Sequence, residues 1–145
     1  MKRYLVLCTG NRCRSQMAHG WLAHLGGAGV HVDSAGTHPK GVHPVAVEVM
    51  AEVGVDISKH TSDHVDRYAD GEYDAVITVC DSAKEACPVF AGAKRTVHRA
   101  FTDPDAEMPV DEQRVLFREI RDEIGAWVRR FLAEERAAAP RPQNG

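Results

Sequence analysis

The stretch LVLCTGNRCRSQMAHGW, residues 5–21, joins a buried-strand pattern to a helical pattern through a short polar loop. Consecutive aliphatic residues in RYLVLC, residues 3–8, predict a strand that ends on the thiol of Cys8. Over residues 15–28, apolar side chains recur at four-residue steps, which predicts a helix that stops at the GGAG sequence. A cysteine therefore stands at the carboxyl end of a strand, where a glycine-containing loop leads into a helix.

Strand and helix patterns alternate along the rest of the chain. Further strands are predicted at VHVDSAG, DAVITVC and RTVHRAF, and further helices at HPVAVEVMAEVG, DSAKEACP and the long segment 111–135. Pro44 suits the first turn of its helix, and Gly54 suits the position just after its end. The long helix is amphipathic, with an apolar side that we expect to contain Val115, Ile120, Ile124, Trp127, Val128 and Phe131.

This alternation predicts an α/β fold, with one domain over residues 1–134 and a four-stranded parallel sheet flanked by helices on both faces. Residues 135–145 are expected to form a disordered tail. In open parallel sheets, ligands bind outside the carboxyl ends of the strands. Cys8 and Cys80 each end a predicted strand, so both should lie at that edge.

Composition narrows the class of protein. The chain has 145 residues and a formal net charge of −3, without the basic excess that is typical of nucleic-acid binding. Its first apolar run breaks at Thr9 and is too short to span a membrane. We therefore expect a cytoplasmic monomer with no nucleic-acid or membrane partner. Because cytoplasmic thiols are kept reduced, the four cysteines indicate catalysis, redox chemistry or metal binding rather than a disulfide framework.

Residues 8–14 have the pattern Cys-x5-Arg. A loop of this length between a strand and a helix turns backbone N–H groups inward, and the helix dipole adds positive charge. A guanidinium at the end of the loop can bind two oxygens of a tetrahedral oxyanion. The same field favours the thiolate of Cys8, which makes it the candidate nucleophile. The candidate binding residues are Thr9, Gly10, Asn11, Arg12, Cys13, Arg14 and Ser15.

A second pair of thiols, Cys80 and Cys87, flanks the predicted helix DSAKEACP. On an intact helix, seven residues separate two Cα atoms by about 10.5 Å. A disulfide needs a separation of roughly 4.4 to 6.8 Å, so a bond between these thiols requires the segment to unwind. Zinc is the alternative, but Cys-x4-Cys with Cys-x6-Cys fits the usual spacings poorly, and we assign no metal ligands.

The sequence CTGNRCRSQMA resembles the phosphate-binding loop that low-molecular-weight protein tyrosine phosphatases share with the thioredoxin-coupled arsenate reductases of the same fold. Four further stretches resemble the arsenate reductase branch, in order, between residue 4 and about residue 130: SAGTHPKGVHP, VDISKHTS, DAVITVCDSAKEACPVF and HRAFTDP. The phosphatase branch shares the loop and the Asp-Pro pair but has no counterpart to VCDSAKEACP.

This resemblance implies that the chain reduces arsenate to arsenite for arsenic detoxification, without a bound cofactor. Cys8 would attack arsenate in the loop, while Asp103 of the Asp-Pro pair protonates the departing oxygen. Cys80 would then attack Cys8 and release arsenite. Cys87 would attack Cys80, and thioredoxin would reduce the resulting disulfide. The resemblance assigns no role to Cys13, which is expected to be structural.

Some positions depart from the pattern of these reductases. Arg12 replaces a common serine, and Arg99 in HRAF lies where His-Trp-Gly-Phe is more usual. His19 replaces a glutamate that in some members binds potassium together with the positions filled here by Asn11, Ser34 and Asp63. An imidazole is a poor ligand for potassium, so we expect no potassium effect in this chain.

Three other functions stay open at the level of sequence. The loop and Asp103 suffice for hydrolysis of phosphate monoesters, for which the second thiol pair would be dispensable. An arsenate reductase that uses a small thiol such as mycothiol would not need an internal relay. A redox sensor or an oxyanion-binding module would bind without turnover.

Overall fold

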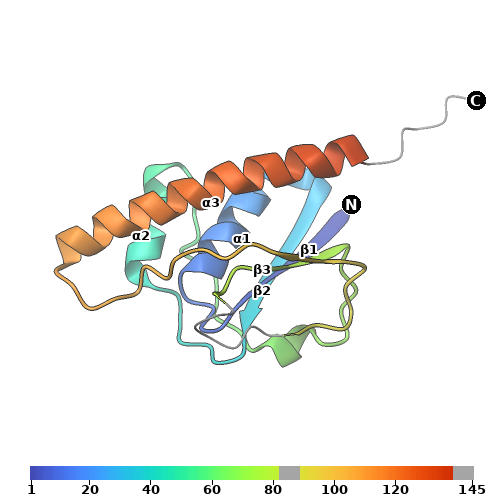
Figure 1. Cartoon of the computed structure of the whole chain (residues 1–145), viewed down its shortest axis with the longest axis horizontal. Coiled ribbons are helices and arrows are strands. Elements are labelled where there is room, and N and C mark those ends of the chain that lie inside the picture. Colours follow the sequence, from blue (N-terminus) through green and yellow to red (C-terminus); the bar gives the residue numbers. More distant parts are fainter. Residues whose placement is uncertain (82–88, 139–145) are drawn as a thin grey trace, which may run out of the picture.

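The computed structural model of the chain describes residues 1–81 and 89–138. Within these residues the strands are β1 (Lys2–Cys8), β2 (Val30–Gly36), β3 (Ala75–Thr78) and β4 (Thr96–His98). The α-helices are α1 (Arg14–Gly26), α2 (Pro44–Glu52) and α3 (Val110–Ala138), and the short 3-10 helices are η1 (Gly27–Gly29) and η2 (Val65–Tyr68). Figure 1 shows α3 crossing the molecule above α1 and the strands. All but the first residue of the predicted helix DSAKEACP lies outside the described residues.

The four strands form one parallel sheet in the order β2-β1-β3-β4, which confirms the predicted sheet. β1 lies inside the sheet, with Cys8 opposite Gly36 of β2 and Leu7 opposite Thr78 of β3. Its side chains from Tyr4 to Cys8 are all buried, as the uninterrupted aliphatic run predicts for a strand covered on both faces.

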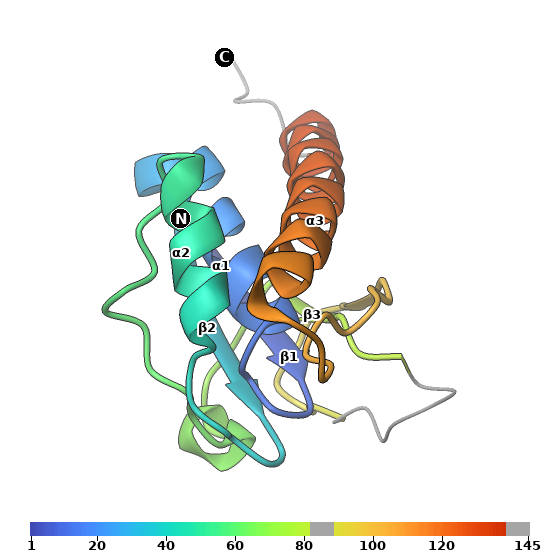
Figure 2. The same ribbon diagram turned by 90° about the vertical axis from the view of Figure 1, so that its left-hand side faces the viewer.

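The three α-helices pack on one face of the sheet, as the end-on view in Figure 2 shows. Side chains of alternate strand residues, such as Val6 and Ile77, contribute to the large core beneath these helices. The opposite face buries a smaller cluster against η2 and the segment around Phe90: Leu5, Leu7, Ala35, Tyr73 and Val76. Helices thus flank the sheet as predicted, and within the described residues the second face is covered by η2 and the segment around Phe90.

α3 is amphipathic, but its buried side differs from the prediction at one end. Val115 has 53% of its surface exposed, because Phe117, two residues and about 200° further round the helix, takes the inward position in that turn. The helix also continues to Ala138, past the predicted domain end at residue 134, and Glu135 accepts a hydrogen bond from the hydroxyl of Tyr4. In the part of the chain that the structure describes, no helix combines the length and apolarity needed to cross a membrane.

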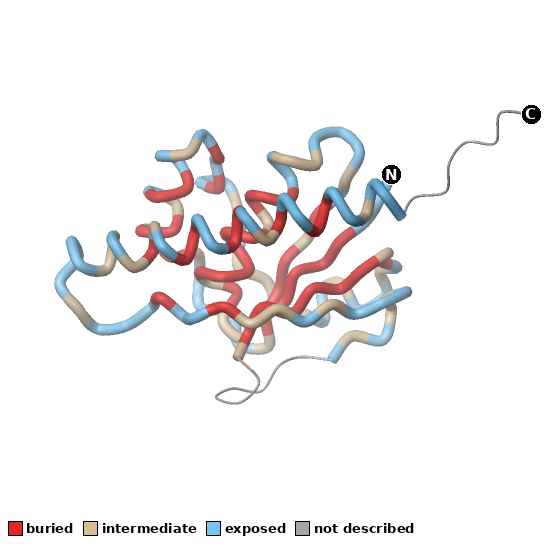
Figure 3. Tube along the Cα trace, turned by 45° about the horizontal axis from the view of Figure 1, so that its top comes forward, coloured by how far each residue is buried: buried red, intermediate tan, exposed pale blue. Residues whose placement is uncertain are grey.

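The two cysteines that were predicted to end strands both lie at the carboxyl edge of the sheet. Cys8 ends β1, and Cys80 follows β3, whose Val79 donates its N–H to the carbonyl of Leu7 at 3.0 Å. Both cysteines are buried, in line with the dense burial of the strands in Figure 3. The topology therefore brings residues 72 positions apart in sequence to neighbouring strand ends.

Candidate active site

The loop over residues 8–14, here called the anion loop, links the end of β1 to the first residue of α1. Asn11 adopts a left-handed conformation with φ of 43°, which a short polar side chain tolerates better than most. Its side chain is fully buried and holds the loop in place: Oδ1 accepts the N–H of Asp63 at 2.9 Å, and Nδ2 donates to Ser15 Oγ at 2.8 Å.

Carbonyl groups of the anion loop point outward to the segment over residues 38–43 of the same chain. Those of Thr9 and Gly10 accept the N–H groups of His38 at 2.9 Å and Lys40 at 3.0 Å, and that of Arg12 accepts the N–H of His43 at 3.0 Å. A trans peptide directs each carbonyl and the following N–H in opposite directions. The N–H groups that follow these carbonyls therefore face the hollow of the loop, where an anion needs donors.

Gly36 explains why the neighbouring segment can approach the anion loop so closely. A Cβ atom at this position would lie 2.5 Å from the carbonyl oxygen of Thr9 and 2.8 Å from that of Cys8. Only glycine avoids this overlap, so Gly36 is required by the packing of β2 against the loop.

The sulfur of Cys8 lies 2.9 Å from Ser15 Oγ. Because Asn11 donates to the same hydroxyl oxygen, the hydroxyl hydrogen of Ser15 is directed to the sulfur. A hydroxyl donor stabilises a thiolate, which is the nucleophilic form of cysteine. The side chains of Asn11 and Ser15 therefore support the Cys8 thiolate, and the expected part of these two residues in substrate binding stays a prediction.

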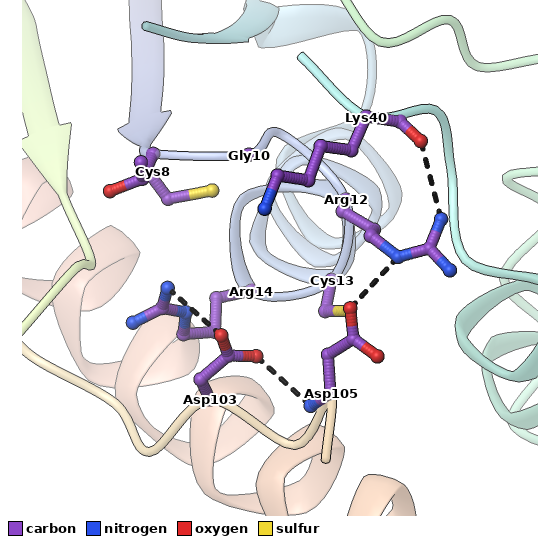
Figure 4. Close-up of a pocket in the computed structure, with 9 residues that line it drawn as sticks. Cys8, Gly10, Arg12, Cys13, Arg14, Lys40, Asp103 and Asp105 are labelled. Carbon is purple, nitrogen blue, oxygen red and sulfur yellow. Dashed lines mark hydrogen bonds and ion pairs between the residues drawn. The ribbon is translucent and has the colours of Figure 1, made fainter. Parts of the chain in front are cut away.

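A cavity of about 200 Å³ opens above the anion loop. Figure 4 shows the side chains of Arg14 and Lys40 reaching toward the space that the Cys8 sulfur faces. The guanidinium of Arg14 is buried, donates to the carbonyl of Phe101 at 3.4 Å and lies 3.6 Å from Oδ2 of Asp103. The cavity is lined by Cys8, Thr9, Gly10, Arg12, Cys13, Arg14, Lys40, Asp103 and Asp105.

Lys40 and Asp105 also line this cavity, and neither is among the predicted site residues. Lys40 lies in the segment after β2, and its aliphatic stem passes over Gly10. A Cβ atom added to Gly10 would be 3.8 Å from Cδ of Lys40. Asp105 follows the Asp-Pro pair directly, and that adjacency is the one local signal that could have indicated it. Its carboxylate accepts from Arg12 Nε at 2.9 Å. Arg12, predicted as a binding residue, therefore also pairs with this carboxylate in the lining of the cavity.

Burial decides the chemistry of Cys13. Burial raises the pKa of the Cys13 thiol far above its ordinary value, and the negative charges of Asp103 and Asp105 raise it further. The thiol therefore stays protonated at neutral pH, and the side chain packs in the core beside Cys8. A protonated thiol is a weak nucleophile, so this environment separates Cys13 from Cys8 in reactivity.

Cys80 is fully buried and is bonded in a disulfide, whereas Cys8 and Cys13 carry free thiols. Val79, the residue before Cys80, is next to Cys8 in the register of the two strands, as the pair Leu7 and Thr78 shows. Cys87 lies outside the described residues.

His19 lies beside the anion loop, where its Nδ1 is 2.8 Å from Ser34 Oγ and its ring stacks on His60 with 4.1 Å between the ring centroids. Burial, together with the neighbouring His60, lowers the pKa of His19 to about 4. A neutral, stacked ring occupies this position at physiological pH. Within residues 1–81 and 89–138, no group of three or more His, Cys, Asp or Glu side chains is arranged to hold a metal ion.

Comparisons with known proteins agree with the motifs. The family model described as low molecular weight phosphotyrosine protein phosphatase matches residues 3–139. An arsenate reductase of Halalkalibacterium halodurans is 44% identical over 126 residues, covering 86% of this chain and 91% of that protein.

Solved structures extend the similarity to three dimensions. A structure described as an arsenate reductase in the reduced state is 33% identical, with a TM-score of 0.76, and the match covers 92% of this chain and 98% of that one. A thioredoxin-dependent arsenate reductase of Corynebacterium glutamicum is 26% identical, with a TM-score of 0.72, over 96% of this chain and 64% of that one.

Proposed function

Because the chain belongs to the low molecular weight phosphotyrosine protein phosphatase family and is similar to arsenate reductases over most of its length, we propose that it reduces arsenate to arsenite with thioredoxin as electron donor. One observation supports this most strongly: the sulfur of Cys8 faces an anion cavity that also holds the guanidinium of Arg14. A nucleophile and an oxyanion site therefore share one small space.

Binding of arsenate uses the anion loop and Arg14. The inward N–H groups and the amino end of α1 attract the negative oxygens, and the planar guanidinium binds two of them. In the unliganded site Arg14 lies 3.6 Å from the carboxyl of Asp103. A bound oxyanion pairs with the guanidinium of Arg14 in place of Asp103. The negative charge of the oxyanion then favours the protonated form of the Asp103 carboxyl.

The first chemical step forms a bond between the sulfur of Cys8 and arsenic. The thiolate, stabilised by the hydroxyl of Ser15, attacks arsenic as one As–O bond breaks, and Asp103 donates a proton so that the oxygen leaves as water. Arsenic stays in its +5 state, attached to Cys8.

The second step transfers two electrons. The thiolate of Cys80 attacks the sulfur of Cys8, the S–As bond breaks with its electron pair going to arsenic, and arsenite leaves in the +3 state. Cys87 then attacks Cys80, which restores the Cys8 thiolate and leaves a disulfide for thioredoxin to reduce. Since Cys80 is disulfide-bonded in the structure, this bond must be reduced before Cys80 can act on Cys8.

The decisive experiment follows NADPH oxidation by thioredoxin reductase, thioredoxin and the protein after addition of arsenate. Wild type should turn over continuously, whereas Cys87→Ser should stop after one turnover because its Cys8–Cys80 disulfide is not passed on. Cys8→Ser should show no arsenate-dependent oxidation at all.

Phosphate-ester hydrolysis is the rival function, since it needs only the anion loop and Asp103. Hydrolysis of 4-nitrophenyl phosphate should survive both Cys80→Ser and Cys87→Ser, which also checks that these variants are folded. If arsenate produces no oxidation with wild type while the phosphate ester is hydrolysed, the reductase assignment is wrong.

A further inference from the structure

The loop that carries Asp103 is held against the anion loop by the side chain of Asp105. One carboxylate oxygen accepts from Arg12 Nε at 2.9 Å, and the other lies 3.5 Å from Nε2 of His43. Arg12 is itself fixed, because its Nη1 donates to the carbonyls of Lys40 at 3.3 Å and Gly41 at 3.4 Å. Asp105 is thus held from two sides by residues of separate segments.

The tautomer of His43 supports this arrangement. Its Nδ1 accepts the N–H of Val45 at 3.0 Å and so caps the start of α2. Burial first, and then the charge of Arg12, lower the pKa of His43, so the ring is neutral at physiological pH. With Nδ1 acting as acceptor, the single ring hydrogen is on Nε2, which faces Asp105.

The backbone of Asp105 reaches the carboxyl of Asp103. Its N–H donates to Asp103 Oδ1 at 3.0 Å, across the turn that Pro104 stiffens. This bond occupies Oδ1 and leaves Oδ2, which lies 3.6 Å from Arg14, directed to the cavity. A carboxyl held in this way presents one defined oxygen to the bound anion.

We propose that Asp105 is a positioning residue, whose side chain is clamped by Arg12 and His43 so that its backbone N–H orients the carboxyl of Asp103 for proton transfer. This inference rests on the proposed function in one respect, the assignment of Asp103 as proton donor. The hydrogen bond from the Asp105 N–H matters more when substrate binds. The anion then pairs with Arg14 in place of Asp103, and the bond from Asp105 remains to orient the carboxyl.

The test uses Asp105→Ala, which removes the clamped carboxylate and keeps the backbone N–H. Reduced protein is mixed with arsenate without thioredoxin, and the single-turnover loss of thiols is followed. Misplacing a catalytic group can cost about 100-fold, so we expect the maximal rate constant to fall roughly 10- to 100-fold. The half-saturating arsenate concentration should not rise, because the anion loop and Arg14 are intact.

Two further variants separate positioning from a general loss of structure. Asp105→Asn keeps an acceptor for Arg12 and should recover a large part of the rate. In an Asp103→Asn background, Asp105→Ala should cost less than twofold more, because the proton donor is already absent. Asp111→Ala is the matched control, since it removes another exposed aspartate that pairs with an arginine at 2.9 Å and does not line the cavity.

The inference is wrong if Asp105→Ala leaves the maximal rate constant unchanged, or if it lowers the rate equally with and without Asp103. Failure of the proposed function has a different signature, namely no loss of thiols with arsenate in wild type. In that case the same variants are compared with phenyl phosphate, whose poor leaving group needs a proton. The loss with Asp105→Ala and its dependence on Asp103 should then appear in hydrolysis, and their absence there also overturns the inference.

Discussion

The neutral ring of His19 predicts that the protein loses stability between pH 6.5 and pH 4. Burial, then the adjacent His60, lower the pKa of His19 to about 4, while the carboxylates of Asp33 and Asp63 oppose the shift. An unfolded chain accepts this proton near the ordinary value of 6.5. The unfolded state therefore binds more protons than the folded state within this window, and acid favours unfolding.

The shift fixes the size of the effect. A difference of 6.5 − 4 = 2.5 pKa units corresponds to about 3.4 kcal/mol once the pH is below both values. At pH 7.5 the ring is neutral in both states and the penalty is negligible. At pH 5.0 the unfolded state is protonated and the folded state is mostly not, which lowers the free energy of unfolding by roughly 2 kcal/mol.

Urea denaturation of wild type and His19→Gln at pH 7.5 and 5.0 measures this effect. Glutamine keeps a polar group for Ser34 and has no titration in this range, so the variant should lose about 2 kcal/mol less than wild type between the two pH values. Titratable groups that do not interact with His19 behave alike in both proteins, so their contributions cancel in the difference. Equal losses in the two proteins would show that His19 is not held neutral by its surroundings.

Three further outcomes follow from single contacts. Lys40→Met removes an ammonium that lines the cavity, so the half-saturating arsenate concentration should rise about 3- to 10-fold, and unchanged steady-state kinetics would exclude Lys40 from binding. Replacing sodium by potassium at constant ionic strength should leave the rate of arsenate reduction unchanged because of His19, and marked activation would contradict this. Gly125→Ala should lower the free energy of unfolding by about 1 to 2 kcal/mol, since its Cβ would be 2.8 Å from Cε2 of Trp21. A more stable variant in urea denaturation would show that α3 can shift.

The parts of the fold that local sequence determines were predictable. α2 begins at Pro44 and is followed by Gly54 at φ of 79°, in agreement with the helix signals read from the sequence. The anion loop could be predicted equally well, because Cys8, the loop and Arg14 are contiguous in sequence. Their geometry depends on the strand before the loop and the helix after it. The family resemblance, based on ordered motifs along the chain, is confirmed by the family model and the curated relatives.

The contacts that could not be predicted join distant segments. Arg12 and Asp105 are 93 residues apart, and no periodicity in either segment indicates that their side chains meet. The position of Lys40 depends on how the segment after β2 passes Gly10, which is a tertiary feature. Val115 was predicted on the buried side of α3, but the neighbouring Phe117 takes the inward position, and apolar character alone does not show which of the two faces the core.

The unequal covering of the two faces of the sheet has a consequence for local opening. The free energy needed to expose a segment rises with the apolar contacts that it must break, and the cluster under η2 is much smaller than the core beneath the α-helices. Backbone amides of residues 65–68 and 90–93 should therefore exchange with solvent deuterium well before those in the middle of α1 or α3. The thiol relay proposed for the end of β3 needs local movement of the chain, and the smaller cluster on this face should oppose such movement less than the core beneath the α-helices does.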